Sequence, residues 1–140
     1  MAFTTVQKTF VQPMTTPQPL NSNVITEMSK DAFGQALVAN RGALIIKFGA
    51  EWCGPCKKVD PLVYRWMNQL PETIQGAVID IDDEASFDLY AFLKSKKQVN
   101  GVPVILCYKK GNMTYIPDHV IVGADEDQIE RFFLVCMNYA

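Results

Sequence analysis

A strongly apolar segment that runs almost directly into a pair of cysteines is the feature that most restricts the fold of this chain. Residues 43–49, ALIIKFG, are apolar almost without interruption, which is typical of a strand buried on both faces of a parallel sheet. Residues 53–70 carry apolar side chains at helical spacing, and Pro55 suits the first helical turn. The pattern therefore predicts a buried strand followed by a helix, with Cys53 and Cys56 at the junction.

The remaining elements follow from the same periodicity. Residues 76–82, GAVIDID, are predicted to form a second buried strand, which the intervening helix would connect to the first in a parallel crossover. Residues 102–117 are predicted to form a hairpin with its turn at 109–112, KKGN. Further elements are expected as a short strand over 23–28 and helices over 30–40, 84–97 and 125–138, with Ser29 and Asp125 as N-caps. The predicted fold class is α/β, with a central mixed sheet covered by helices.

The composition is that of one globular domain preceded by an arm. The 140 residues are 49% apolar and 20% charged, which suits a folded chain. We expect a domain over 24–140 and an extended or poorly ordered, proline-containing arm over 1–23. The arm has no acidic residue, so an organellar targeting peptide is the alternative. A net charge of −2 and the lack of a long apolar run predict no nucleic-acid or membrane partner.

The cysteine pair has three possible uses: half of a zinc site, a structural disulfide or a redox-active dithiol. Four cysteines are too few for a secreted disulfide scaffold, so a reducing, cytoplasmic setting is expected. A zinc site needs more ligands, and Cys107, Cys136 and His119 are isolated, so no metal is predicted. The helix N-terminus would stabilise a thiolate at Cys53, which favours redox chemistry with Cys56 close enough to attack a mixed disulfide.

Three motifs, in this order, resemble those of the thioredoxin family. Residues 52–57, WCGPCK, resemble the active-site motif of thioredoxins. Pro61 falls where that family has a kink in the active-site helix. Residues 101–103, GVP, resemble its cis-proline loop, and residues 122–125, VGAD, resemble the glycine-containing turn beside its substrate groove. Order and spacing agree over residues 24–139, so the resemblance implies a thioredoxin fold.

The resemblance also implies a protein-disulfide reductase that needs no cofactor. Cys53 is expected to attack a substrate disulfide and Cys56 to resolve the mixed disulfide, which leaves a disulfide between the two cysteines. Gly54 and Pro55 are expected to keep the gap short and the first turn rigid, and a cis peptide bond is expected before Pro103. The expected substrate groove consists of Trp52, Gly101, Val102, Pro103 and Gly123.

The partners implied by the resemblance are disulfide-containing client proteins and an electron donor such as thioredoxin reductase. The chain itself is expected to be a monomer. The alternative is a thioredoxin-like binding or adaptor subunit of a larger complex, in which the dithiol is secondary. The N-terminal arm and two segments that are longer than in a compact thioredoxin favour this alternative.

Lys47 departs from the family pattern. Thioredoxins usually carry a buried aspartate at this strand position, and the lysine that accompanies it would align with Val78. One hypothesis is that the Lys47 ammonium reaches water or pairs with Asp80. The other places Lys47 within reach of the dithiol as active-site support, where a cation would favour a thiolate or a neutral amine would act as a base. A stabilised thiolate would make the protein a weaker reductant, or an oxidant or isomerase.

Overall fold

The computed structural model describes residues 17–140, and its centre is a four-stranded mixed sheet. The strands are β1 (Ala43–Gly49), β2 (Ile74–Asp80), β3 (Val104–Lys109) and β4 (His119–Val122). They lie in the order β2-β1-β3-β4. Strand β1 is parallel to β2 and antiparallel to β3, which in turn is antiparallel to β4. The parallel pairing of β1 with β2 confirms the predicted crossover.

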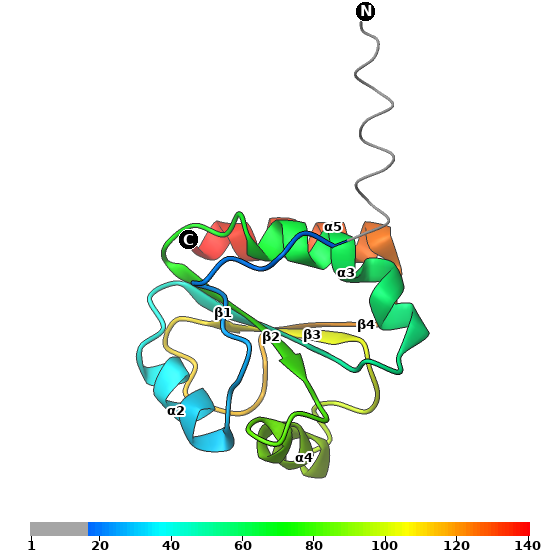
Figure 1. Ribbon diagram of the computed structural model, residues 1–140. Coiled ribbons are helices and arrows are strands. Elements are labelled where there is room, and N and C mark those ends of the chain that lie inside the picture. Colours follow the sequence, from blue (N-terminus) through cyan, green and yellow to red (C-terminus); the bar gives the residue numbers. More distant parts are fainter. Residues whose placement is uncertain (1–16) are drawn as a thin grey trace, which may run out of the picture.

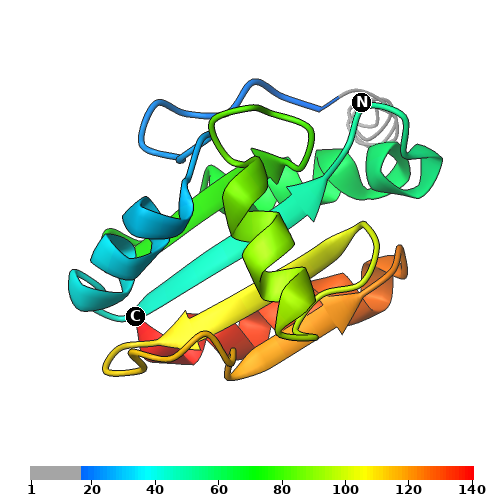
Figure 2. The ribbon, with the colours of Figure 1, turned by 90° about the horizontal axis from the view of Figure 1, so that it is seen from below.

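Helices cover both faces of this sheet. They are α2 (Lys30–Val38), α3 (Gly54–Met67), α4 (Phe87–Ser95) and α5 (Glu126–Cys136), followed by the short 3₁₀ helix η2 (Met137–Tyr139). Helices α3 and α5 lie on one face, and α2 and α4 lie on the other (Figures 1 and 2). The predicted α/β architecture, with helices on both faces of a mixed sheet, is confirmed.

Strand β1 contributes side chains to two separate hydrophobic cores, because successive residues of a strand point to opposite faces. The core beneath α2 and α4 takes Leu44, Ile46 and Phe48 from this strand. The core beneath α3 and α5 takes Ala43 and Ile45. The same alternation directs Lys47 toward α3, onto the face of β1 that also carries Ala43 and Ile45.

The local signals at three helices act as the sequence predicts. The side chain of Ser29 accepts a hydrogen bond from the backbone N–H of Ala32 at 3.1 Å, and that of Asp125 accepts one from Gln128 at 3.1 Å. These two caps satisfy N–H groups that have no partner inside α2 and α5. Pro61 lies inside α3, and the axis of that helix changes direction along its length (Figure 1).

The expected strand over 23–28 is wrong in extent. Only Ile25 pairs with β2, through one parallel bridge to Ala77. The N–H of Ile25 donates to Gly76 at 3.0 Å, and its carbonyl accepts from Val78 at 2.8 Å. The flanking residues supply no further ladder bonds with β2, so the segment touches the edge of the sheet at one point.

A strand antiparallel to β3 follows it as expected, but the turn and the second arm of the predicted hairpin are wrong. Strand β4 begins at His119, so residues 110–118 form a longer loop instead of a tight turn at 109–112. The side-chain amide of Asn112 donates to the Ile116 carbonyl at 2.9 Å and to the Asp118 carboxylate at 3.0 Å. These side-chain bonds take the place of ladder bonds, and Pro117 has no N–H to donate.

Helix α4 begins at Phe87, three residues later than expected. The preceding residues form a turn in which the N–H of Ser86 donates to the carbonyl of Asp83 at 3.0 Å. The buried Ser86 hydroxyl accepts a hydrogen bond from the N–H of Met28 at 2.9 Å. This link holds the chain before α2 against the start of α4, so the residues before Phe87 serve a tertiary contact.

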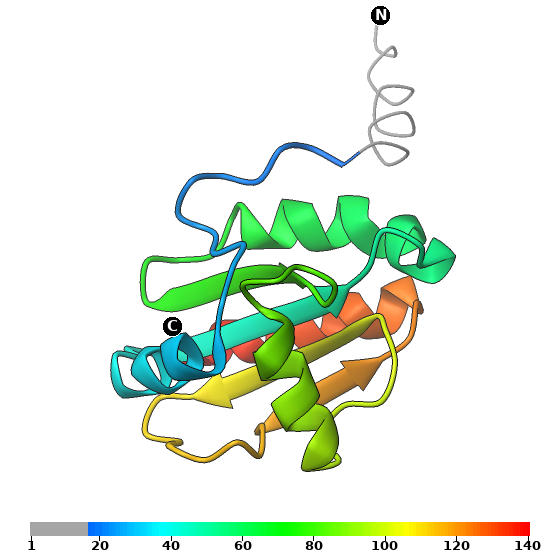
Figure 3. The same cartoon turned by 60° about the horizontal axis from the view of Figure 1, so that its bottom comes forward.

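The part of the predicted arm that the structure describes, residues 17–23, runs beside α3 (Figure 3). The N–H of Asn21 donates to the side chain of Asn68 at 2.8 Å, and the amide of Asn68 donates to the Pro19 carbonyl at 2.9 Å. Residues 1–16 of the predicted arm lie outside the described residues. Within residues 17–140, no helix has the length and apolar character needed to cross a membrane.

The packing around Gly42 leads to a stability prediction. A Cβ atom at this buried position would lie 2.5 Å from the carbonyl oxygen of Tyr139 and 2.8 Å from that of Thr73. Both are backbone atoms, which cannot rotate away. We expect Gly42→Ala to lower the free energy of unfolding by about 1–3 kcal/mol, measured by urea denaturation.

The matched control for this substitution is Gly34→Ala. Gly34 is exposed inside α2, and a Cβ there would meet no atom within 4 Å. Since alanine favours the helix over glycine, we expect the free energy of unfolding to rise by roughly 0.5–1 kcal/mol. A similar change in both variants would show that the contacts of Gly42 do not decide the effect.

Candidate active site

The cysteine pair lies where β1 gives way to α3, as predicted. Cys53 is the N-cap of α3, and its Sγ accepts a hydrogen bond from the backbone N–H of Cys56 at 3.1 Å. The two cysteines form a disulfide, with Cα atoms 5.3 Å apart. Both are buried. Pro55 lies in the first turn, where its missing N–H leaves no bond unmade.

The helix N-terminus gives Cys53 the electrostatic setting of a reactive thiol. The unpaired N–H groups of the first turn and the helix dipole both favour negative charge at this point. The hydrogen bond that Sγ already accepts would strengthen in a thiolate, because charged acceptors bind N–H groups more strongly. When the disulfide is reduced, this position therefore favours the thiolate of Cys53.

The loop before β3 lies against the cysteine pair. The carbonyl oxygen of Val102 is 3.7 Å from Cys53 Sγ, and the peptide bond between Val102 and Pro103 is cis, as expected. The N–H of Gly123 donates to the Pro103 carbonyl at 3.0 Å, and the N–H of Gly101 donates to the Tyr90 hydroxyl at 2.8 Å. The structure thus places Val102 against Cys53, and a hydrogen bond joins Gly123, from a later part of the sequence, to the same loop.

Trp52, the remaining residue of the expected groove, is 69% exposed beside the dithiol. Its indole N–H donates to the carboxylate of Asp82 at 2.8 Å, which fixes the ring. The sequence interpretation did not assign a role to Asp82. It lies in an acidic run before α4, and nothing in that run distinguishes it from its neighbours.

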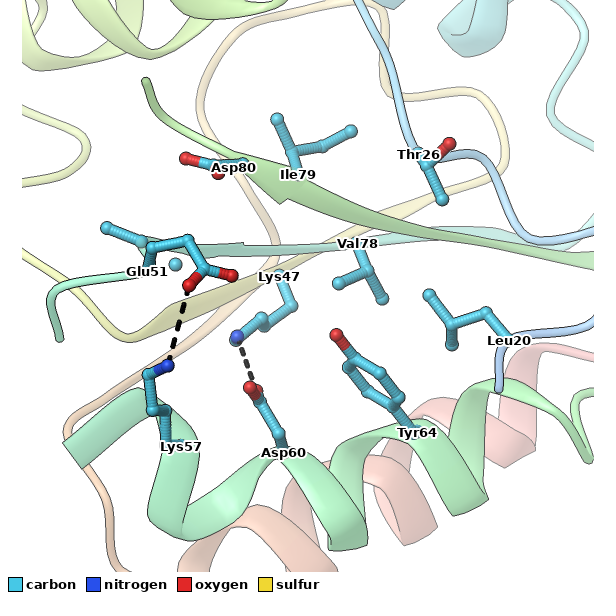
Figure 4. A pocket seen from close by; sticks show the side chains of 12 residues that line it. Leu20, Thr26, Lys47, Glu51, Lys57, Asp60, Tyr64, Val78, Ile79 and Asp80 are labelled. Carbon is cyan, nitrogen blue, oxygen red and sulfur yellow. Dashed lines mark hydrogen bonds and ion pairs between the residues drawn. The ribbon is translucent and has the colours of Figure 1, made fainter. Parts of the chain in front are cut away.

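Lys47 neither reaches water nor pairs with Asp80, so that hypothesis is wrong. Its side chain is 4% exposed, and its Nζ lies 2.7 Å from Oδ1 of Asp60 on α3 (Figure 4). Asp80 lines the same cavity but is not the residue that binds the ammonium. Asp60 follows Cys56 by four residues and therefore shares its helix face, but no signal in the sequence pairs it with Lys47.

The other two cysteines lie apart from the dithiol. Cys107 on β3 and Cys136 on α5 are buried free thiols in the core beneath α3 and α5. A hydrogen bond with Cys136, together with burial, raises the pKa of Cys107 well above its usual range. His119 lies near Tyr139, whose hydroxyl is 2.5 Å from Nε2. Among residues 17–140 no three potential ligand residues are grouped to hold a metal ion.

Comparison with known proteins gives a consistent result. The family model described as Thioredoxin matches residues 24–134. The mitochondrial thioredoxin of Mus musculus is 30% identical over 100 residues, which cover 71% of this chain and 55% of that protein. The thioredoxin of Acidithiobacillus ferridurans is 25% identical over 92 residues, covering 66% of this chain and 80% of that protein. The chain thus spans about half the length of the mitochondrial relatives it matches.

Solved structures agree with the sequence matches. The structure of oxidised thioredoxin O2 from Arabidopsis thaliana superposes with a TM-score of 0.65 at 25% identity, covering 88% of this chain and all of that one. Thioredoxin NaTrxh from Nicotiana alata superposes with a TM-score of 0.63 at 23% identity, covering 86% and 97% of the two chains. The family model matches residues 24–134, which make up most of the chain, and the chain therefore belongs to the thioredoxin family.

Proposed function

We propose that this chain is a thiol–disulfide oxidoreductase that reduces protein disulfides through Cys53 and Cys56. The observation that carries this proposal is the Cys53–Cys56 disulfide at the N-terminus of α3. The Cα separation of 5.3 Å falls within the range of ordinary disulfides, so the backbone at the start of α3 suits the oxidised form.

The reaction takes two exchange steps. The Cys53 thiolate attacks one sulfur of a client disulfide, so that a Cys53–client disulfide forms and the other client sulfur leaves as a thiolate. Cys56 then loses its proton and attacks Cys53 Sγ. This forms the Cys53–Cys56 disulfide and releases the second client sulfur. The client gains two electrons and two protons, and the chain loses them.

The residues around Cys53 suit the binding of an extended client segment. Trp52 offers an exposed aromatic surface beside the dithiol. On the loop before β3, Gly101 presents no side chain, and Val102 is half-buried next to Cys53. Gly123 has a φ of +98°, which favours glycine, and its N–H holds the Pro103 carbonyl. We propose these five residues as the client groove.

The proposed partners are disulfide-containing proteins and a thioredoxin reductase or an equivalent electron donor, with the chain acting as a monomer. A cytoplasmic location stays a prediction, and the relatives include proteins named as mitochondrial and chloroplastic. The alternative role as a binding or adaptor subunit is not favoured. In a binding or adaptor subunit, the dithiol would not need the helix N-terminus that stabilises a thiolate at Cys53.

The first prediction of the proposed function concerns activity. With dithiothreitol as electron donor, the full chain should accelerate the reduction of insulin disulfides, followed by turbidity. Cys53→Ser should reduce the rate to that of dithiothreitol alone, because it removes the attacking thiolate. Cys56→Ser should instead accumulate a mixed disulfide with insulin, detected by non-reducing electrophoresis, because Cys53 can attack but nothing resolves the product.

The double variant Cys53→Ser/Cys56→Ser is the control for this assay, since it retains Cys107 and Cys136. Insulin reduction by the double variant, or a mixed disulfide that forms equally well without Cys53, would contradict the assignment of the two cysteines.

The second prediction concerns the number of reactive thiols. The reduced native protein should release two equivalents of thiolate dye from Ellman's reagent. Cys53 attacks the reagent and releases the first equivalent, and Cys56 then attacks Cys53 Sγ and displaces the second. Burial should keep both Cys107 and Cys136 from reacting in the folded state, and the raised pKa of Cys107 further disfavours its own thiolate. In denaturant the count should rise to four. Three or more equivalents from the native protein would show that the core thiols are accessible.

A further inference from the structure

A cavity of about 230 Å³ lies on the side of the sheet that α3 covers (Figure 4). Its lining includes Lys47 from β1, Asp60 and Tyr64 from α3, and Asp80 from β2. A buried lysine is unusual in a hydrophobic core, because taking an ammonium out of water is unfavourable unless a partner compensates. The location of this lysine therefore calls for a chemical explanation.

Asp60 supplies the compensation. Its Oδ1 lies 2.7 Å from Lys47 Nζ, and the two side chains are 17% and 4% exposed. Figure 4 shows the two side chains pointing toward one another across the space between β1 and α3. The lysine is thus the buried cation of a salt bridge whose anion is nearer to solvent.

The ammonium lies close to the second cysteine. A Cβ atom built on Gly49 would be 2.5 Å from Lys47 Nζ and 3.5 Å from Cys56 Sγ, so that the nitrogen and the sulfur are at most about 6.0 Å apart. Cys56 and Asp60 are four residues apart on α3 and share one helix face. A cation at this range, shielded from water, stabilises a thiolate.

The other charged groups near this site are more exposed or carry negative charge. Lys57 lies 3.5 Å from Glu51, and these side chains are 59% and 88% exposed, so water screens the pair. The carboxylate of Asp80 lines the cavity. Burial raises the pKa of the Tyr64 hydroxyl, and the negative charges of Asp60 and Glu51 raise it further. Among the described residues that line the cavity, Lys47 is therefore the buried source of positive charge.

We propose that the Lys47 ammonium stabilises the Cys56 thiolate, and that Asp60 holds the ammonium in place while limiting its effect, within the exchange reaction that is itself the proposed function. In the resolving step the Cys56 proton passes to solvent, and the thiolate attacks Cys53 Sγ. The Cys53–Cys56 bond forms as the Cys53–client bond breaks, and the client sulfur leaves as a thiolate that takes up a proton from solvent. Lys47 and Asp60 are positioning residues for this step.

The test uses two substitutions that should act in opposite directions. The ionisation of Cys56 in the reduced protein is followed by the ¹³Cβ chemical shift of labelled cysteine as a function of pH. Lys47→Met removes the cation, so the titration midpoint should rise by about one pH unit. Asp60→Asn removes the anion and leaves the ammonium, so the midpoint should fall by roughly half a unit.

Two further variants keep the test decisive. Lys57→Met makes the same charge change at an exposed lysine and should move the midpoint by no more than roughly 0.3 units. Lys47→Met/Asp60→Asn removes both charges and should give a midpoint between those of the single variants. If Lys47→Met does not fold, this double variant serves as the reference for Asp60→Asn. Midpoints that stay fixed, or move in the same direction in both single variants, would overturn the proposal.

Insulin reduction by the wild-type protein, measured in parallel, separates this proposal from the proposed function. Activity with unmoved midpoints overturns only the role of the ion pair. Midpoints that move in opposite directions without any reductase activity support the role of the ion pair in Cys56 ionisation and overturn the reductase.

Discussion

Strand β1 pairs with β2 along one edge and with β3 along the other, and both of its faces are buried. The loop after β1 begins where the parallel pairing ends, so Cys53 and the N-terminus of α3 lie at the carboxyl end of the central strand. The antiparallel register places Val104 opposite Phe48, which brings the residues just before β3 to the same end. Two segments far apart in sequence therefore meet at the dithiol because β1 pairs directly with the antiparallel strand β3.

The ion pair beneath the dithiol places two charged side chains beside the core that α3 and α5 cover. Lys47 follows Ile45 on the face of β1 that α3 covers, and a hydrophobic side chain would fill that space without loss of water contacts. Replacing buried ion pairs by apolar residues is often neutral or stabilising, so stability does not account for Lys47 and Asp60. Their proximity to Cys56 does, since an ammonium held next to a thiol changes the balance between thiol and thiolate.

Sequence alone predicted the parts of the structure that depend on local pattern. The continuous apolar run specified β1 at its observed bounds, and the caps at Ser29 and Asp125 specified helix starts. The loop after β3 was mispredicted because side-chain bonds of Asn112, and not turn residues alone, determine its course. Lys47 was identified as unusual, but its partner was not. The pairing depends on how closely α3 packs over β1, which no single segment encodes.

The reduction potential of the Cys53–Cys56 couple tests most directly whether a reversible dithiol is tuned by a buried cation. It would be measured at pH 9, because alkaline pH favours the thiolate over the thiol, by equilibrating the wild-type protein and its Lys47→Met variant with a glutathione buffer. Lys47 stabilises the reduced form, so the wild-type potential should be less negative than that of the variant, by about 30 mV for a tenfold effect. Equal potentials would contradict a role for Lys47, and a disulfide that does not exchange with glutathione would contradict the account as a whole.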